Sequence, residues 1–201
     1  MKLIATVMIS AFVFFTMSSI LPTQEDFELY DSCVRLHVLA NSDNEKDQSL
    51  KLKIRDELLK EVNSLEISSK SDALGKIEKN KDQLVKIAEG VAEKEGFDYE
   101  VSIEACQEFY PTRYYDDFSL PAGKYTSIKV KIGEGSGQNW WCVLYPPLCT
   151  QGAIAYDEEA CLEVGLTKNQ YDLITANKSG EYKIKFKILE IAAEAFGFDY
   201  D

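Results

Sequence analysis

The sequence predicts an α+β fold: one domain with an antiparallel sheet of about four strands packed against two to three helices, preceded by an N-terminal export segment. Apolar residues recur at helical spacing between residues 50 and 91. On both sides of that region they alternate with polar residues, as in strands with one buried face. The chain has 201 residues, of which 45% are hydrophobic, so one domain can bury its own core.

The first 21 residues predict export. Lys2 is followed by 19 uncharged, mostly apolar residues, and then by Pro22 and an acidic stretch. We expect residues 1–21 to be a signal peptide or a membrane anchor, because about 20 apolar residues can span a bilayer as a helix. We favour cleavage over a retained anchor. Residues 22–32 are expected to be a linker, and residues 33–201 a single α+β domain.

The first half of the domain reads as a strand followed by two helices. Val34, Leu36 and Val38 alternate with polar residues and predict the strand. Ser42 and Glu45 have the spacing of a capping box, which predicts a helix start. The first helix has its apolar stripe at Leu50, Ile54, Leu58, Val62 and Leu65. The second has its stripe at Leu74, Ile77, Leu84, Ile87, Ala88 and Val91, and Gly96 is placed to cap its carboxyl end.

Two strands are then predicted at residues 99–105 and 126–132, where apolar residues alternate with glutamates in the first and with lysines in the second. Opposite charges favour pairing across an antiparallel sheet. The connection, residues 109–121, holds five aromatic residues and is expected either to pack on the sheet or to form a recognition surface.

The last third of the chain is less regular. Residues 156–160 and 167–171 predict short helical turns. Residues 181–196 predict a helix, with a strand over 182–188 as the competing interpretation because lysines alternate there with apolar residues.

The most unusual stretch is 133–149, which contains both tryptophans of the chain. Its glycines predict a shaped turn between strands. Trp140 and Trp141 are adjacent in an extended segment and should point to opposite faces, one into the core and one outward as a contact anchor. The strand that follows should end at Pro146, since proline cannot donate to a sheet ladder.

Three segments resemble the stage II sporulation protein R family of endospore-forming bacteria: Arg35–Asp43, Phe109–Arg113 and Gly133–Cys149. The resemblance implies a signalling protein made in the forespore and exported into the space between the two sporulation membranes. There the family activates a membrane-embedded aspartic protease of the mother cell, which matures a sigma factor precursor. We expect the residues that bind this partner to be Gln138, Asn139, Trp140, Trp141, Tyr110 and Arg113.

The chain contains five cysteines, an odd number, so at least one thiol is free or paired between chains. Export permits disulfides, and Cys142 and Cys149 are close enough in sequence to close a short loop. We expect them to form a bridge. Cys33, Cys106 and Cys161 are interpreted as small core residues. The cysteine and histidine spacing does not suggest a zinc site.

Catalytic motifs are few, and we expect no enzymatic activity. His37 is the single histidine and is interpreted as structural, since no local nucleophile signature accompanies it. The alternative hypothesis is a cell-envelope thiol hydrolase with Cys142 as nucleophile and His37 as base. The carboxylates at 116–117 and 157–159 are interpreted as solvated surface, and the glycine run 133–137 lacks the lysine of a phosphate loop. No cofactor, metal or small-molecule substrate is expected.

The net charge of −12 at pH 7 argues against nucleic acid or anionic lipid as the main partner, because both carry negative charge. The oligomeric state is left open by the sequence.

Overall fold

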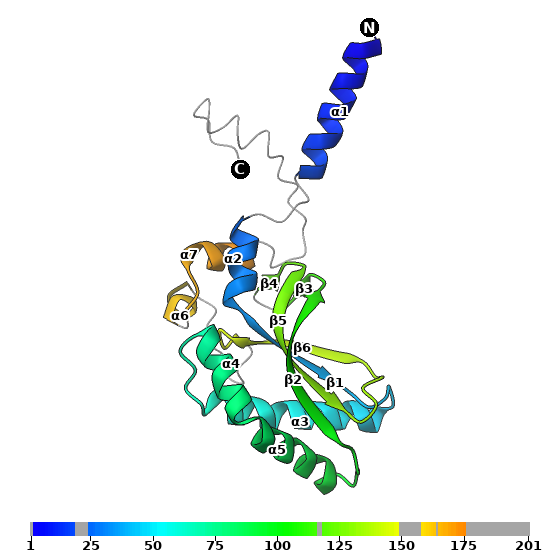
Figure 1. Ribbon diagram of the computed structural model, residues 1–201, viewed down its shortest axis with the longest axis vertical. Helices are drawn as coiled ribbons and strands as arrows, with labels where there is room; N and C mark the ends of the chain where they lie inside the picture. The colour runs from blue at the N-terminus through cyan, green and yellow to red at the C-terminus, as the bar shows by residue number, and fades with distance from the viewer. Residues whose placement is uncertain (1, 19–23, 116–117, 149–157, 164, 176–201) are drawn as a thin grey trace.

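A computed structural model describes residues 2–18, 24–115, 118–148, 158–163 and 165–175 (Figure 1). Its helices and strands are, in chain order, α1 Lys2–Ser18, α2 Gln24–Ser32, β1 Val34–Leu39, α3 Glu45–Asn63, α4 Lys70–Lys79, α5 Lys81–Lys94, β2 Val101–Tyr110, β3 Arg113–Tyr114, β4 Ser119–Leu120, β5 Gly123–Ile132, β6 Asn139–Tyr145, α6 Glu158–Glu163 and α7 Lys168–Thr175.

The α+β class is confirmed, but the expectation of an antiparallel sheet is wrong. The four-stranded sheet has the order β2-β5-β1-β6 and is mixed, since β1 and β5 run parallel while β2 pairs antiparallel with β5 and β6 antiparallel with β1. The reason lies in the connection: the chain leaves β1, forms three helices and β2, and returns as β5 beside β1. A crossover of this length permits parallel pairing.

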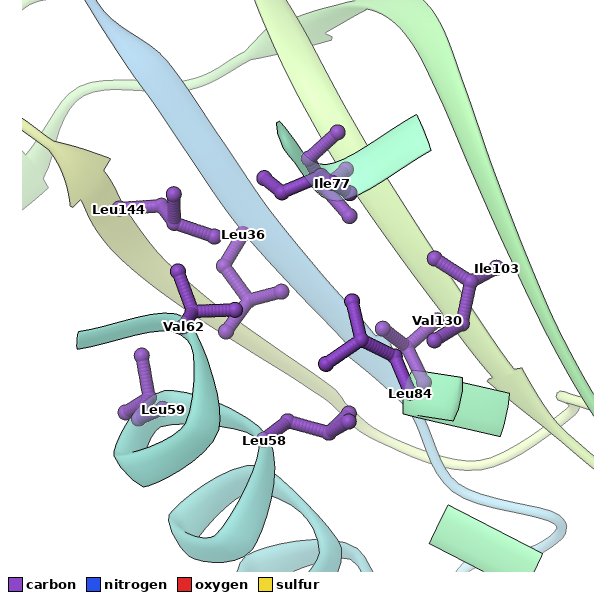
Figure 2. Close-up of a pocket in the computed structure, with 10 residues that line it drawn as sticks. Leu36, Leu58, Leu59, Val62, Ile77, Leu84, Ile103, Val130 and Leu144 are labelled. Carbon is purple, nitrogen blue, oxygen red and sulfur yellow. The ribbon is translucent and has the colours of Figure 1, made fainter. Parts of the chain in front are cut away.

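Helices α3, α4 and α5 lie along one face of the sheet (Figure 1). The side chains between them form the larger core, in which Leu36 of β1, Leu58 of α3 and Leu84 of α5 are each 3% exposed or less. Figure 2 shows these side chains converging with Ile77 of α4 and Ile103 of β2. The helical stripes and strand alternation seen in the sequence therefore meet in one apolar layer.

The predicted capping box at the start of α3 is not formed. Asn44 is the N-cap, and its side chain accepts a hydrogen bond from the backbone N–H of Asp47 at 2.8 Å. The hydroxyl of Ser42 instead donates to the Asp47 carboxylate at 2.7 Å. Because that carboxylate is buried and needs donors, it draws Ser42 away from the cap.

The second predicted helix is divided at Asn80, between α4 and α5. The Asn80 side chain donates to the carbonyl of Lys76 at 2.7 Å and so satisfies a carbonyl at the end of α4. Gly96 follows α5 with a φ of +83°, the left-handed conformation expected of it.

A second core covers part of the other face of the sheet, and it includes a segment that we expected to be a linker. Residues 24–32 form α2, and Leu29 and Tyr30 are almost fully buried there. The acidic composition of this segment led us to predict a linker, although Leu29 and Tyr30 give its helix a buried face. The aromatic connection packs here too, since Phe118 and Leu120 of the β3–β4 hairpin are buried in the same cluster.

The short helices α6 and α7 agree with the predicted turns, whereas residues 181–196 lie outside the described part of the chain. The N-terminal helix α1 has exposed apolar side chains from Leu3 to Phe14. None of the helices in the described ranges has the length and hydropathy needed for a membrane span. The export segment remains a prediction.

Candidate functional site

The three segments that carry the family resemblance are neighbours in the sheet. The turn between β5 and β6 lies where β1 ends, and residues 109–113 lie toward the end where β1 begins. β1 and β6 are neighbours, with Arg35 opposite Val143 and His37 opposite Trp141. From the hairpin, Arg113 reaches this surface, and its guanidinium carbon lies 3.5 Å from the centre of the Trp141 ring. We call this assembly the motif surface: residues 35–43, 109–113 and 133–145.

The turn between β5 and β6 is hydrogen-bonded to the loop that follows β1. The backbone N–H groups of Ser136 and Gly137 donate to the carbonyls of Asn41 and Ala40, at 3.2 and 3.0 Å. The N–H of Gln138 donates to the Asp43 carboxylate at 2.7 Å. A Cβ on Gly137 would lie 2.2 Å from the carbonyl oxygen of Ser42, so only glycine allows this approach.

Beneath the turn, the carboxylate of Asp47 is the centre of a buried polar network. It accepts hydrogen bonds from the hydroxyls of Ser42 and Tyr99 and from the side-chain amide of Asn41. Burial acts to raise the pKa of Asp47, but these hydrogen bonds outweigh it and hold the pKa below its usual value. The ionised carboxylate thus fixes the loop that receives the glycine turn.

Arg35 is the largest fully buried side chain of the motif surface, with no exposed area. Its guanidinium carbon lies 4.2 Å from the ring centre of Tyr110 and 5.0 Å from that of Tyr125. Its Nε donates to the carbonyl of Cys142 at 3.1 Å and its Nη2 to the hydroxyl of Tyr115 at 3.0 Å. This side chain therefore ties β1, β2, β5, β6 and the hairpin together.

His37 is held between two oxygen atoms. Its Nδ1 lies 3.0 Å from a carboxylate oxygen of Glu108, and its Nε2 lies 2.8 Å from the amide oxygen of Asn139. Lys129 pairs with the same glutamate at 3.1 Å. Burial acts to raise the pKa of Glu108, but hydrogen bonds from Ser127, His37 and Lys129 lower it. His37 therefore has the satisfied, structural environment that we expected.

Cys142 and His37 lie on opposite faces of the sheet, which argues against the hydrolase hypothesis. Cys142 pairs with Leu36 and is buried in the core under the helices. The His37 ring lies on the other face, 5.6 Å from the Trp141 ring. Because the sheet separates the two side chains, they cannot act as nucleophile and base on one substrate.

The two tryptophans lie on opposite faces of β6, as expected from their adjacency. Trp140 lies over the helix side, with 37% of its surface exposed, and the Arg55 guanidinium carbon is 4.2 Å from its ring centre. Trp141 is half-buried and packs against the second core. Trp140 is therefore the outward ring.

The other predicted contact residues have different environments. Gln138 and Asn139 are exposed, and Arg113 is half-buried on Trp141. Tyr110 is only 1% exposed and cannot contact a partner, because strand register turns it under Arg35. Its neighbour Phe109, which the prediction omitted, is 74% exposed. Alternation along β2 could have shown that only one of these two rings faces outward.

Cys33 and Cys106 carry free thiols, and Cys33 and Cys161 are buried as expected. Burial raises the pKa of Cys33 to about 11. Cys149 lies outside the described residues, so the bridge to Cys142 stays a prediction. In the described ranges no group of three or more His, Cys, Asp or Glu side chains is arranged to hold a metal ion. Carboxylates 116, 117 and 157 lie outside these ranges.

Residues 30–154 match the family model described as stage II sporulation protein R. The stage II sporulation protein R of Bacillus subtilis (strain 168) is 40% identical over 121 residues, which cover 59% of this chain and 54% of that relative. The chain thus matches about half the length of this relative. No solved structure matches the chain.

Proposed function

Since this chain belongs to the stage II sporulation protein R family, we propose that it is an exported signalling protein of spore formation. It is made in the forespore and exported across the cytoplasmic membrane by residues 1–21. In the space between the two sporulation membranes it activates a membrane-embedded aspartic protease, which matures a sigma factor precursor.

The main observation that supports this proposal is that three segments far apart in the sequence pack together in the motif surface. Arg35, Arg113 and Trp141 come from separate segments. The Arg113 guanidinium stacks on the Trp141 ring. The Tyr115 hydroxyl accepts a hydrogen bond from Arg35 and donates one to the Trp141 carbonyl. A surface assembled in this way is rigid, and a rigid surface loses little conformational entropy when it binds another protein.

The chemistry of the exposed part suits protein recognition. Trp140 presents a large ring supported by Arg55, and the exposed Gln138 lies two residues before it in the same segment. The exposed Asn139 has its amide oxygen on His37, on the other face of the sheet. Aromatic anchors with polar groups around them are typical of the residues that dominate binding energy. The separation of Cys142 from His37 removes the thiol mechanism as a competing proposal.

We further propose that Cys142 and Cys149 form a disulfide that fixes the end of β6. In the chain-entropy model a loop this short contributes about 2.5 kcal/mol to stability. Mass spectrometry of a non-reduced digest, prepared from protein in its native compartment, should find the two cysteines in one linked peptide pair. Free thiols at both positions would refute the bridge.

The proposed function can be tested in vesicles that contain the protease and its sigma factor precursor. We expect cleavage of the precursor only when the full-length chain is supplied on the extracytoplasmic face. As a control, the protein should be unfolded by heat before addition and should then give no cleavage. Equal cleavage without the chain, or with the chain supplied only on the cytoplasmic face, would refute the proposed function.

A further inference from the structure

β2 is an edge strand of the four-stranded sheet, and in the described ranges it pairs with β5 alone (Figure 1). Two hydrogen bonds show which way its backbone groups point. The N–H of Gly133 donates to the carbonyl of Glu100 at 2.9 Å, so Glu100 faces the neighbouring strand. The N–H of Val101 donates to the Glu89 carboxylate at 3.2 Å, away from that strand.

This alternation continues along β2, because its pairing with β5 has no register shift from Val101 to Tyr110. The N–H and C=O groups of Ile103, Ala105, Gln107 and Phe109 therefore point outward from the sheet. Within the described part of the chain no group bonds to them. An open ladder on a strand of ten residues is unusual, since proteins commonly shorten or cover such edges.

The side chains along this edge differ between the two faces. On the helix side, α5 covers the first half of β2, and beyond it Ala105, Gln107 and Phe109 are exposed. On the other side lie Glu104, which is exposed, and Glu108, which is half-buried and already pairs with His37 and Lys129. An added strand would therefore meet apolar surface on one face and carboxylates on the other.

We propose that β2 accepts an extended segment of a partner protein as a fifth strand, with Lys or Arg alternating with apolar residues along that segment. Backbone hydrogen bonds to the outward groups give affinity, and the alternating side chains give specificity. A basic residue lies beside the exposed Glu104, and the apolar residues lie beside Ala105 and Phe109. That the partner is the activated protease rests on the proposed function, whereas the docking mode does not.

A second copy of the chain is a poorer occupant. Antiparallel pairing of two β2 strands centred on Cys106 would place Glu104 opposite Glu108 in both halves. Shifts that centre the pairing on either glutamate would place that residue opposite itself. Like charges directly opposite each other are destabilising, so these glutamates disfavour three of the antiparallel registers and leave to a second copy those centred on Ala105 or Gln107.

The docking mode can be tested with the full-length chain and a synthetic peptide, acetyl-Lys-Val-Lys-Phe-Lys-Val-Lys-amide. Binding should slow the exchange of the amide protons of Ile103, Ala105 and Gln107, measured by NMR. A matched peptide that is N-methylated at alternate residues on its pairing edge cannot donate there and should not bind. A glutamate version of the peptide should bind at least about tenfold more weakly.

A variant pair isolates the backbone contribution. Ala105→Pro removes one outward N–H without removing a bond to β5, because proline is tolerated on the free side of an edge strand. Ala105→Thr keeps the N–H and favours the strand. We expect Ala105→Pro to weaken peptide binding about tenfold and Ala105→Thr, which changes only the contacting side chain, to weaken it clearly less. The same order should hold for protease activation.

Several results would overturn the inference. One is equal binding of the plain and N-methylated peptides, and another is the absence of binding by either. Slow exchange of the three amides in the free chain would mean that a segment of its own, such as residues 182–188 with their alternating lysines, occupies the edge. If the wild-type chain and the Ala105→Pro variant activate the protease equally, the docking mode is refuted while the proposed function stands. If the wild-type chain binds the peptide but does not activate the protease, the proposed function is refuted while the docking mode stands.

Discussion

The guanidinium carbon of Arg113 lies 3.5 Å from the centre of the Trp141 ring, although the two residues belong to different sheets. This contact joins the β3–β4 hairpin to β6. The hairpin also supplies Tyr115, whose hydroxyl accepts a hydrogen bond from Arg35. The motif surface therefore depends on side chains that cross between elements as well as on the backbone ladder.

We predict that Arg35→Lys destabilises the fold by about 2–3 kcal/mol. An ammonium group cannot stack on Tyr110 and also reach both the Cys142 carbonyl and the Tyr115 hydroxyl. Chemical denaturation of both proteins measures this difference. Arg55→Lys is the control, expected to cost less than about 1 kcal/mol because Arg55 stacks on one half-exposed ring. Equal effects in the two variants would contradict the role of Arg35.

Gly137→Ala should destabilise the fold by about 1–3 kcal/mol, because the added Cβ would collide with the backbone of Ser42. Gly90→Ala is the matched control. Gly90 lies inside α5 with no atom within 4 Å of the added Cβ, so alanine should stabilise by about 0.5–1 kcal/mol. Thermal melts of both variants should shift in opposite directions. A melt of Gly137→Ala at or above that of the wild type would refute the proposed contact.

Asp47→Asn should cost about 1–3 kcal/mol at neutral pH, because the ionised carboxylate accepts several hydrogen bonds. The pKa of Asp47 in the folded protein is below its unfolded value of about 3.9. This stabilisation is therefore complete above about pH 4 and is lost as the pH falls through the lower folded pKa. Unfolding free energies measured for both proteins from pH 7 to pH 3 should draw closer as the pH falls below about 4. A difference that stays constant with pH would show that the Asp47 carboxylate has its usual pKa.

Local patterns predicted much of this fold. The period of apolar residues located β1, α3, β2 and β5, since each has one face in the core under the helices. Local patterns could not predict the strand order, because the parallel pairing of β1 with β5 joins residues about 90 positions apart. The helix α2 was missed for a related reason: its burial depends on partners from the other end of the chain, such as Ile174.

The candidate site was predicted in part. The adjacent tryptophans and the turn glycines were identified from their residue types. The burial of side chains on the helix-free face was not predicted. Arg35 and His37 alternate with apolar residues, and this pattern indicates a solvated side. In the structure Tyr110, Tyr125 and the hairpin cover Arg35. Strand register was also unknown from the sequence. Tyr110 was therefore predicted as the contact ring, although Phe109 is the exposed one.

The central claim is that Trp140 contacts the protease. Its direct test compares Trp140→Ala with Leu52→Ala, since each of these side chains is 37% exposed on the same protein. Both variants should retain a melting temperature close to that of the wild type. In vesicles with the protease and its precursor, Trp140→Ala should reduce activation by about 30-fold, the effect of losing about 2 kcal/mol of binding, and Leu52→Ala should leave it unchanged. Wild-type activation by a folded Trp140→Ala variant would contradict the claim.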